Sequence, residues 1–265
     1  MKIVRSKTFA NGSVYCARLA DGKLIEMTDT FLPFYTKDAI GRKQNKLVTK
    51  DIGSRKERWM IGVSCMSGCP VRCKFCATGQ MKGWRNLTAD EIFEQVMFVF
   101  EQNQIDLCEV KEFKINYTRM GEPFLNIDNV RKAIEMIDAW CMAGFGIRPH
   151  HYISTIGLRG SDYSWVKGNI TLQVSLHASS DAKRRELIPM PNLMTIEELG
   201  QIRTRSLLKT TLNMTLVDED DFDIEVLKTH FDPKCFFIKL SPINPNEVSD
   251  GNSMGRGIIE GVNLL

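Results

Sequence analysis

The sequence predicts an α/β fold: a partial (β/α)6, TIM-like barrel with a small N-terminal β extension. Three observations predict it. After residue 57, short apolar runs alternate with amphipathic segments, which favours parallel strands joined by right-handed helical crossovers. Two hairpin signals, Asn11-Gly12 and Asp21-Gly22, divide residues 2–27 into two or three short strands. The 265 residues, 43% of them hydrophobic, are enough to bury one barrel core.

The six barrel strands are expected at 59–64, 113–118, 151–155, 170–176, 211–217 and 235–240. A helix should begin at Thr88, because Glu91 completes a capping box, and should end near residue 103. Further helices are expected at 127–140, near 161, and at 182–187, 196–206 and 224–230. These elements predict three parts: a β extension with a basic linker (1–56), the barrel (57–246) and a C-terminal tail (247–265).

Three cysteines, Cys69, Cys73 and Cys76, follow the first barrel strand in a C-x3-C-x2-C spacing. A [4Fe-4S] cluster usually binds four thiolates, so three leave one iron open to a non-protein ligand. One alternative is a zinc site with Cys65 as the fourth thiolate, but zinc sites usually split their ligands into two separated pairs. A purely structural cluster is another alternative.

Chemistry in barrels of this type gathers where strands end. The second strand ends in Gly121-Glu122-Pro123, and the proline forces Glu122 into an extended conformation. Other strand ends carry Ser154, Ser175, Leu176, His177 and Asn244. Each piece alone also fits an ordinary turn or a core histidine, so the order and placement of the whole set carry the prediction.

The cysteine spacing, with the aromatic Phe75 before the last cysteine, resembles the signature of the radical SAM superfamily. The motifs around the strand ends resemble one branch of it, the adenosine C2 (or C8) RNA methyl synthases, over about residues 59–246. The matching stretches are 86–92, 120–126, the stretch at Ser154, 175–181 with Arg185, 188–189 and 244–245.

This resemblance implies that Cys69, Cys73 and Cys76 bind a [4Fe-4S] cluster. It also implies contacts to S-adenosylmethionine from Gly121, Glu122, Ser154, Ser175, Leu176, His177 and Asn244. In that superfamily, reductive cleavage of S-adenosylmethionine yields a 5'-deoxyadenosyl radical, and the protein supplies the cluster, orientation and exclusion of water. An electron donor of the flavodoxin or ferredoxin type is therefore expected as a partner.

The sequence also departs from the methyl synthases. Gly62 stands where that family has a resolving cysteine, and no cysteine follows Cys235 to carry a methyl group. The short β extension stands in place of the family's helical N-terminal domain. In that family a cysteine carries the methyl group to the RNA base. Without such a thiol this two-step transfer lacks its nucleophile, so no catalytic residue is assigned.

We therefore expect a radical SAM enzyme acting on a nucleic acid or nucleotide. One alternative is RNA adenosine methylation, with Cys65 or Cys235 in place of the missing thiols or with a longer native C-terminus than this chain has. Another is a cluster-bearing module that never cleaves the cofactor. Residues 1–60 carry 13 Lys or Arg against 6 Asp or Glu, which fits a polyanionic partner and equally fits a solvated charged surface. The predicted basic patch comprises Lys37, Arg42, Lys43, Lys46, Arg55, Lys56 and Arg58. Eight cysteines, with no apolar leader or membrane-spanning run, predict a reducing, cytoplasmic location.

Overall fold

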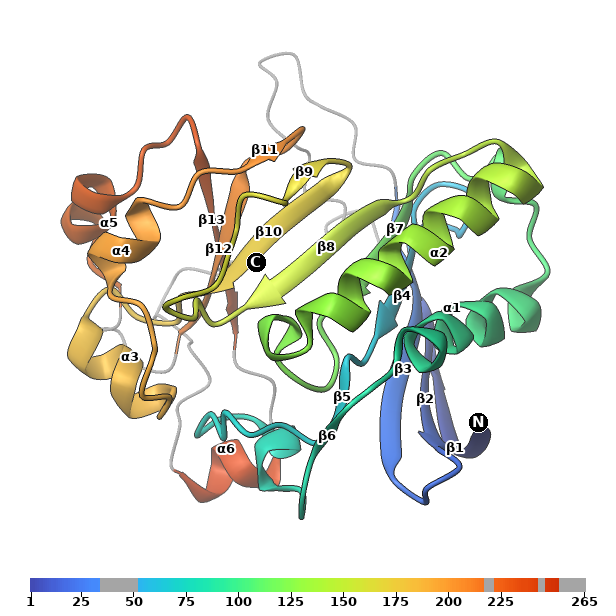
Figure 1. Ribbon diagram of the computed structural model, residues 1–265, viewed down its shortest axis with the longest axis horizontal. Coiled ribbons are helices and arrows are strands. Elements are labelled where there is room, and N and C mark those ends of the chain that lie inside the picture. Colours follow the sequence, from blue (N-terminus) through green and yellow to red (C-terminus); the bar gives the residue numbers. More distant parts are fainter. Residues whose placement is uncertain (34–51, 217–221, 243–245, 253–265) are drawn as a thin grey trace. The chain divides into compact units, whose positions relative to one another are not determined.

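The computed structural model describes residues 1–33, 52–216, 222–242 and 246–252. The chain forms two compact units (Figure 1). The first unit comprises Met1–Ser67, Leu87–Met120 and Ile127–His151, and the second comprises Gly68–Asn86, Gly121–Asn126 and Tyr152–Leu265. The predicted division at residues 56 and 246 follows different lines from these units and stays a prediction.

The first unit begins with an antiparallel ladder. Its strands are β1 (Lys2–Phe9), β2 (Gly12–Arg18) and β3 (Leu24–Phe31), so both predicted hairpins are confirmed. The ladder continues into the barrel strands, because β3 pairs antiparallel with β4 (Trp59–Val63) and β4 pairs parallel with β7 (Phe113–Tyr117). The β extension is therefore hydrogen-bonded directly to the first barrel strand.

Two long helices cover one face of these strands. They are α1 (Ala89–Asn103) and α2 (Ile127–Phe145), which pack against each other, and α1 packs on β3 and β4 (Figure 1). The predicted capping box at the start of α1 is confirmed: Thr88 Oγ1 accepts from the Glu91 N–H, and the Glu91 carboxylate accepts from the Thr88 N–H. The Trp59 ring stacks on Phe100 of α1 at 6.4 Å, which marks the core side of the sheet.

The second unit is built on parallel strands. Strand β8 (His150–Thr155) starts in the first unit and ends in the second, where the strand order is β8-β10-β12-β13. Here β10 is Ile170–Ser175, β12 is Thr210–Leu216 and β13 is Phe236–Pro242, and these three pair in parallel. The helices are α3 (Asp181–Leu187), α4 (Ile196–Gly200), α5 (Ile224–His230) and α6 (Glu247–Gly251).

Short elements connect the larger ones. They are β5 (Met66–Ser67), β6 (Arg85–Asn86), β9 (Lys167–Gly168), β11 (Arg205–Ser206) and the 3-10 turns η2 (Ala77–Gln80), η3 (Leu107–Glu109) and η4 (Pro123–Leu125).

The predicted α/β class with parallel strands is confirmed, and two helix predictions are wrong. No helix forms near residue 161, because the Tyr163 hydroxyl accepts from the Leu158 N–H at 2.8 Å and pins a turn there. The helix expected at 196–206 ends at Gly200, because Arg205 and Ser206 pair instead with β9. Closure of the strands into a partial barrel stays a prediction.

Candidate functional site

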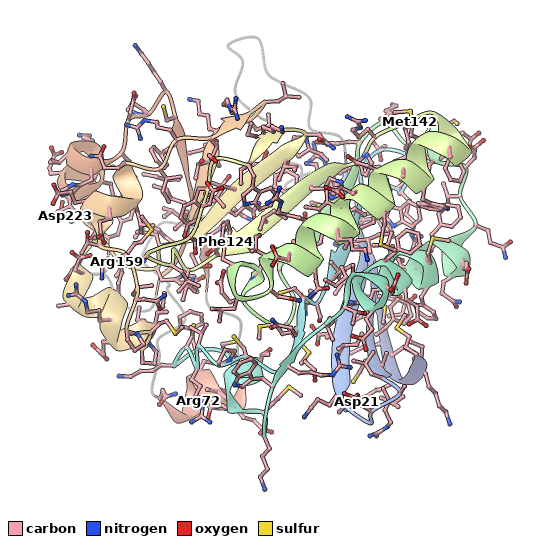
Figure 2. The ribbon with its side chains drawn as sticks, viewed as in Figure 1. Asp21, Arg72, Phe124, Met142, Arg159 and Asp223 are labelled. Atoms are coloured by element: carbon pink, nitrogen blue, oxygen red, sulfur yellow. The ribbon has the colours of Figure 1, made fainter. Side chains whose placement is uncertain are left out.

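Cys69, Cys73 and Cys76 lie in one tight loop of the second unit, all three as free, half-buried thiols. The turn is closed by the Cys76 N–H, which donates to the Cys73 carbonyl at 3.1 Å. Arg72, labelled in Figure 2, takes a left-handed φ of 56°. Its backbone lies so close to Gly79 that a Cβ there would sit 2.7 Å from the Arg72 Cα, so only glycine fits.

The three thiols are close enough to influence one another electrostatically. Burial, and to a smaller extent the charges of Cys76 and Glu122, raise the pKa of Cys69 to about 11, although backbone hydrogen bonds from Val71 and Arg72 lower it. The pKa of Cys73 is raised for the same reasons, burial first, then Cys76, Cys69 and Glu122. Grouped thiols that resist ionisation on their own suit a bound cation, which displaces the protons when it binds.

The three thiols are not grouped as the ligands of a single metal ion would be. Within the described ranges, no three His, Cys, Asp or Glu side chains are grouped tightly enough to hold one metal ion. In a cubane each thiolate binds a different iron, so its sulfurs stand farther apart than the ligands of one zinc. Cys65, the fourth thiol of the zinc alternative, is buried in the first unit, where its Sγ lies 3.5 Å from the Met120 carbonyl oxygen as a donor.

The cysteine loop is anchored through its middle. The Lys74 N–H donates to the Leu187 carbonyl at the end of α3, at 2.9 Å. From α6, Asn246 Nδ2 donates to the Phe75 carbonyl at 3.2 Å and Asn252 Nδ2 donates to the Lys74 carbonyl at 2.7 Å. The backbone between Cys73 and Cys76 is therefore fixed from two helices.

Glu122 presents a buried carboxylate beside this loop. Gly121 has a φ of 104°, and Glu122 is extended before Pro123, as the sequence predicts. Its carboxylate accepts from the Phe124 N–H at 3.1 Å and the Ile156 N–H at 2.9 Å. Burial raises its pKa to about 7, although these hydrogen bonds and one from Thr155 lower it. A carboxyl at this pKa loses its proton when an ammonium group binds beside it.

His177 connects the end of β10 to the cysteine loop. Its ring meets the Phe75 ring edge-on, with centroids 4.7 Å apart, and its Nδ1 accepts from the Thr215 N–H at 3.1 Å. Burial and then the Arg184 charge lower its pKa to about 3, so the imidazole is neutral with its proton on Nε2. Its backbone takes a left-handed φ of 61°, which is strained for histidine and is stabilised by this packing.

Of the other predicted residues, the structure describes all except Asn244. Leu176 is fully buried, and its N–H donates to the Asn213 carbonyl at 2.9 Å. Ser175 ends β10, and Ser154, half-buried near the end of β8, donates to Gln173 Oε1 at 3.1 Å. Asn244 lies outside the described residues. As a set, the assignment of these side chains to a cofactor stays a prediction.

Sequence reasoning missed Arg184 and named its neighbour Arg185 instead. Arg184 is fully buried in α3, whereas Arg185 is exposed. The Arg184 guanidinium donates to the carbonyls of Leu176 at 2.8 Å, Ile156 at 3.1 Å and Ser175 at 3.3 Å. Its Nε has no partner among the described residues. The signal was helical periodicity, because Arg184 shares the buried face of α3 with Leu187 and Ile188.

Two thiols suggested as substitutes are poorly placed for that role. Cys235 precedes β13, whereas the residue of β13 in line with Ser175 is Lys239, four residues later. At about 3.3 Å per residue, Cys235 is roughly 13 Å from the strand ends that carry the site. Cys65 donates to a backbone carbonyl within the first unit, as described above.

The position of the family's resolving cysteine has no room for a side chain. A Cβ on Gly62 would lie 2.3 Å from Thr28 Oγ1 and 3.1 Å from Arg119 Cδ. Arg119 itself forms an ion pair with Glu26. A side chain at position 62 therefore requires the Thr28 side chain to move.

The described part of the predicted basic patch is neutralised. Arg55 pairs with Asp29, Lys56 with Glu109 and Arg58 with Glu112. Lys37, Arg42, Lys43 and Lys46 lie outside the described residues. The patch as predicted therefore offers no uncompensated cation among its described members.

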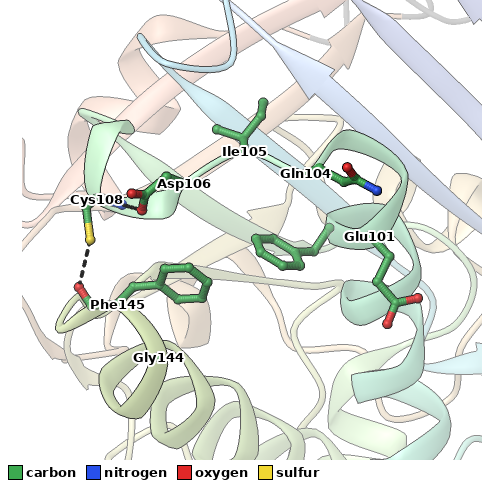
Figure 3. Close-up of a pocket in the computed structure, with 8 residues that line it drawn as sticks. Glu101, Gln104, Ile105, Asp106, Cys108, Gly144 and Phe145 are labelled. Carbon is green, nitrogen blue, oxygen red and sulfur yellow. Dashed lines mark hydrogen bonds between the residues drawn. The ribbon is translucent and has the colours of Figure 1, made fainter.

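The first unit also contains a pocket of about 520 Å³ (Figure 3). It is lined by Phe100, Glu101, Gln104, Ile105, Asp106, Cys108, Gly144 and Phe145. The Cys108 Sγ donates to the Phe145 carbonyl at 3.2 Å. The pocket lies where α1 and α2 end, before β7 begins, which is the end of the strand opposite to its carboxyl end.

The chain matches no protein-family model. It is similar to curated relatives named probable dual-specificity RNA methyltransferase RlmN. That of Dictyoglomus turgidum is 36% identical over 202 residues, covering 75% of this chain and 50% of the relative. That of Heliobacterium modesticaldum is 32% identical over 207 residues, covering 76% and 48%. The chain thus spans about half the length of these relatives.

A solved structure is similar to this chain in its fold. The crystal structure of a radical SAM methyltransferase from Sphaerobacter thermophilus matches with a TM-score of 0.65 and 25% identity. The match covers 92% of this chain and 67% of that one.

Proposed function

We propose, from the premise that this chain carries the radical SAM core of the RNA methyl synthase branch, that it cleaves S-adenosylmethionine reductively and acts on RNA. The observation that supports this best is the grouping of three half-buried thiols with the buried carboxylate of Glu122 in one compact unit.

Cys69, Cys73 and Cys76 would hold a [4Fe-4S] cluster whose fourth iron takes S-adenosylmethionine. When bound, these groups supply a one-electron cleavage that yields the 5'-deoxyadenosyl radical. Glu122 would hold the ammonium of the methionine moiety, since its carboxyl group is buried, lies near the thiols and would lose its proton when a cation binds beside it.

The remaining residues would orient the cofactor and exclude water. His177 stays neutral at physiological pH and packs on the cysteine loop through Phe75, so it can donate from Nε2 without adding charge. Ser154 and Ser175 offer hydroxyl groups near the strand ends, and Gly121 and Leu176 offer close backbone approach. Asn244 is retained in this proposal on the resemblance alone.

RNA is proposed as the substrate because the similar relatives are named RNA methyltransferases. RNA adenosine methylation is the second candidate for the reaction, supported by the 36% identity to such a relative. Gly62 stands in place of one of the two thiols that methyl transfer in the family uses, and a side chain there would meet Thr28. This favours a reaction that stops at hydrogen abstraction.

The electron would come from a flavodoxin- or ferredoxin-type donor. All eight cysteines are free thiols, which supports a reducing, cytoplasmic location. No helix in the described ranges is long and apolar enough to cross a membrane.

An anaerobic assay tests the proposal. The reconstituted chain is reduced with dithionite in the presence of S-adenosylmethionine, with and without total cellular RNA, and 5'-deoxyadenosine is quantified. We expect 5'-deoxyadenosine, increased by RNA; its absence would leave only a cluster-bearing binding module. Mass analysis of the RNA separates the candidates, since a gain of one methyl group identifies methylation.

A further inference from the structure

One face of the β1–β2 hairpin is exposed and carries only positive charge. Strand β1 stands at the end of the strand order, so its outer edge is not paired with any other described strand (Figure 1). All but one of its residues are exposed, on both faces of the strand. Residues 1–20 contain no Asp or Glu.

The register shows which side chains share this face. Lys7 lies opposite Val14, Val14 opposite Thr28, and Thr28 opposite Gly62. The neighbouring residue Tyr15 points the other way, since its ring packs on Phe98 of α1 with centroids 5.2 Å apart. Because successive side chains alternate between faces, Lys7 is on the face opposite to α1, and Arg5 and Phe9 share it.

A β-bulge adds a further cation to this face. The register shifts between Ile3 and Arg5, so Lys2 pairs with Arg18 while Arg5 pairs with Cys16. Without the bulge, Lys2 and Arg5, three positions apart, would point to opposite faces. The extra residue brings Lys2 onto the face of Arg5 and Lys7, where Arg18 of β2 also lies, two residues from Cys16.

These four cations have no carboxylate partner. Among the described residues none of Lys2, Arg5, Lys7 and Arg18 forms an ion pair, in contrast to Arg55, Lys56 and Arg58. The direct cross-strand pairing of Lys2 with Arg18 sets like charges opposite each other, which destabilises a sheet by itself. A bound polyanion would relieve that repulsion.

Phe9 supplies an aromatic surface among the cations. Its side chain is 48% exposed, and Lys7 Nζ lies 5.0 Å from the centre of its ring. Exposed aromatic rings beside Lys and Arg are the elements that bind single-stranded nucleic acid, with bases stacking on the ring and phosphates on the cations.

We propose that the face formed by Lys2, Arg5, Lys7, Arg18 and Phe9 binds single-stranded RNA. This rests on the proposed action on RNA and names the surface that would hold the substrate. Lys7 and Gly62 are three strand spacings apart in the same row, or about 14 Å at roughly 4.8 Å per spacing. An RNA strand on this surface would therefore lie near the sheet row that contains Gly62.

Fluorescence anisotropy with a labelled 20-nucleotide single-stranded RNA tests the proposal on the full chain. Phe9→Ala should weaken binding about 5- to 150-fold through loss of one stacked base. The double variant Arg5→Gln with Lys7→Gln should lower the slope of log Kd against log salt by about 1.4, from two lost phosphate contacts. The matched control is Lys132→Gln on α2, an exposed lysine of the same unit, which should change neither quantity.

Three results would overturn this surface: unchanged affinity in both variants, equal loss in Lys132→Gln, or a β1-dependent dimer by light scattering that RNA does not disrupt. Folding is checked by thermal unfolding, and the charge variant keeps the test valid if Phe9→Ala unfolds. Formation of 5'-deoxyadenosine without RNA is measured on the same preparations. If the wild type cleaves the cofactor but binds no RNA, the surface proposal fails alone; if it binds RNA but cleaves nothing, the proposed activity fails alone.

Discussion

The imidazole of His177 meets the ring of Phe75 edge-on, with centroids 4.7 Å apart and an interplanar angle of 67°. Phe75 lies between two of the site cysteines, and His177 follows strand β10. The contact therefore connects the end of a parallel strand to the cysteine loop, so a change at either residue should affect the other.

Replacing His177 tests this connection. His177→Ala leaves the half-buried Thr215 N–H without its acceptor and removes the ring contact, and we expect a loss of about 1–3 kcal/mol in unfolding free energy. His177→Asn should lose less, since asparagine tolerates a left-handed φ and can accept the same hydrogen bond. Chemical denaturation of the metal-free protein measures both, and equal losses would contradict this account.

Arg184 is expected to be the most sensitive residue of α3. Arg184→Leu leaves three carbonyls at the ends of β8 and β10 without their donor and should destabilise the protein by about 3–5 kcal/mol. The matched control Arg185→Leu, at an exposed position, should stay within about 0.5 kcal/mol of the wild type. Similar losses in the two variants would show that Arg184 does not hold the strand ends.

Stability should depend on pH through two buried groups, Glu122 and His177, whose pKa values are shifted in opposite directions. Glu122 has its pKa raised from 4.5 to about 7, so the folded state holds a proton that the unfolded state loses, and stability falls as pH rises from 4.5 to 7. The loss of unfolding free energy from Glu122 over this pH range is on the order of 3 kcal/mol. His177 has its pKa lowered from 6.5 to about 3, so its contribution is complete above pH 6.5 and is lost as pH falls.

Between pH 4.5 and 6.5 these two effects therefore oppose each other. In Glu122→Gln only the histidine effect remains, and stability should rise with pH by up to about 1.4 kcal/mol per unit. Denaturation curves of the metal-free wild type and variant at several pH values give the difference. Parallel pH profiles would contradict the buried, partly protonated state of Glu122.

Asn252 should control how firmly the cysteine loop is held. Asn252→Ala removes the hydrogen bond to the Lys74 carbonyl, and we expect faster loss of iron to a chelator with little change in thermal unfolding. Glu186→Gln, which removes only the exposed ion pair with Lys74, is the control and should release iron at the wild-type rate. Identical release from all three proteins would mean that this anchor has no effect.

Gly62→Cys should not simply restore the family's thiol. The new Cβ meets Thr28 Oγ1, and we expect a loss of about 1–3 kcal/mol from overpacking. Combining it with Thr28→Ala removes the close atom and should recover most of this loss. Full stability of Gly62→Cys alone would show that the position has room.

Local signals predicted the elements that depend on local chemistry. The capping box of Thr88 and Glu91, the hairpins at Gly12 and Gly22, and the extended Glu122 before Pro123 all follow from interactions within a few residues. Alternation of strands and helices predicted the parallel pairing, because a helical crossover lets the next strand run in the same direction.

Features that depend on distant partners could not be predicted in this way. The end of the helix at Gly200 depends on strand pairing of Arg205 with β9, and the burial of Arg184 depends on carbonyls of two strands. The bulge that aligns Lys2 with Arg5 leaves no sequence signal, because it exists only in the pairing with β2. The charge count located the excess in residues 1–60, but ion pairs with Asp29, Glu109 and Glu112 decide which cations stay available.

The central claim is that three thiols hold a cluster with one open iron beside Glu122. Two spectroscopic methods test it directly on the reduced, anaerobically reconstituted protein: electron paramagnetic resonance and electron-nuclear double resonance. Both use S-adenosylmethionine labelled with ¹⁵N in its amino group. We predict a [4Fe-4S] signal that changes when the cofactor is added and that couples to the labelled nitrogen, and that is lost in Cys73→Ala. A signal insensitive to the cofactor, or a colourless protein that binds zinc, would contradict the account.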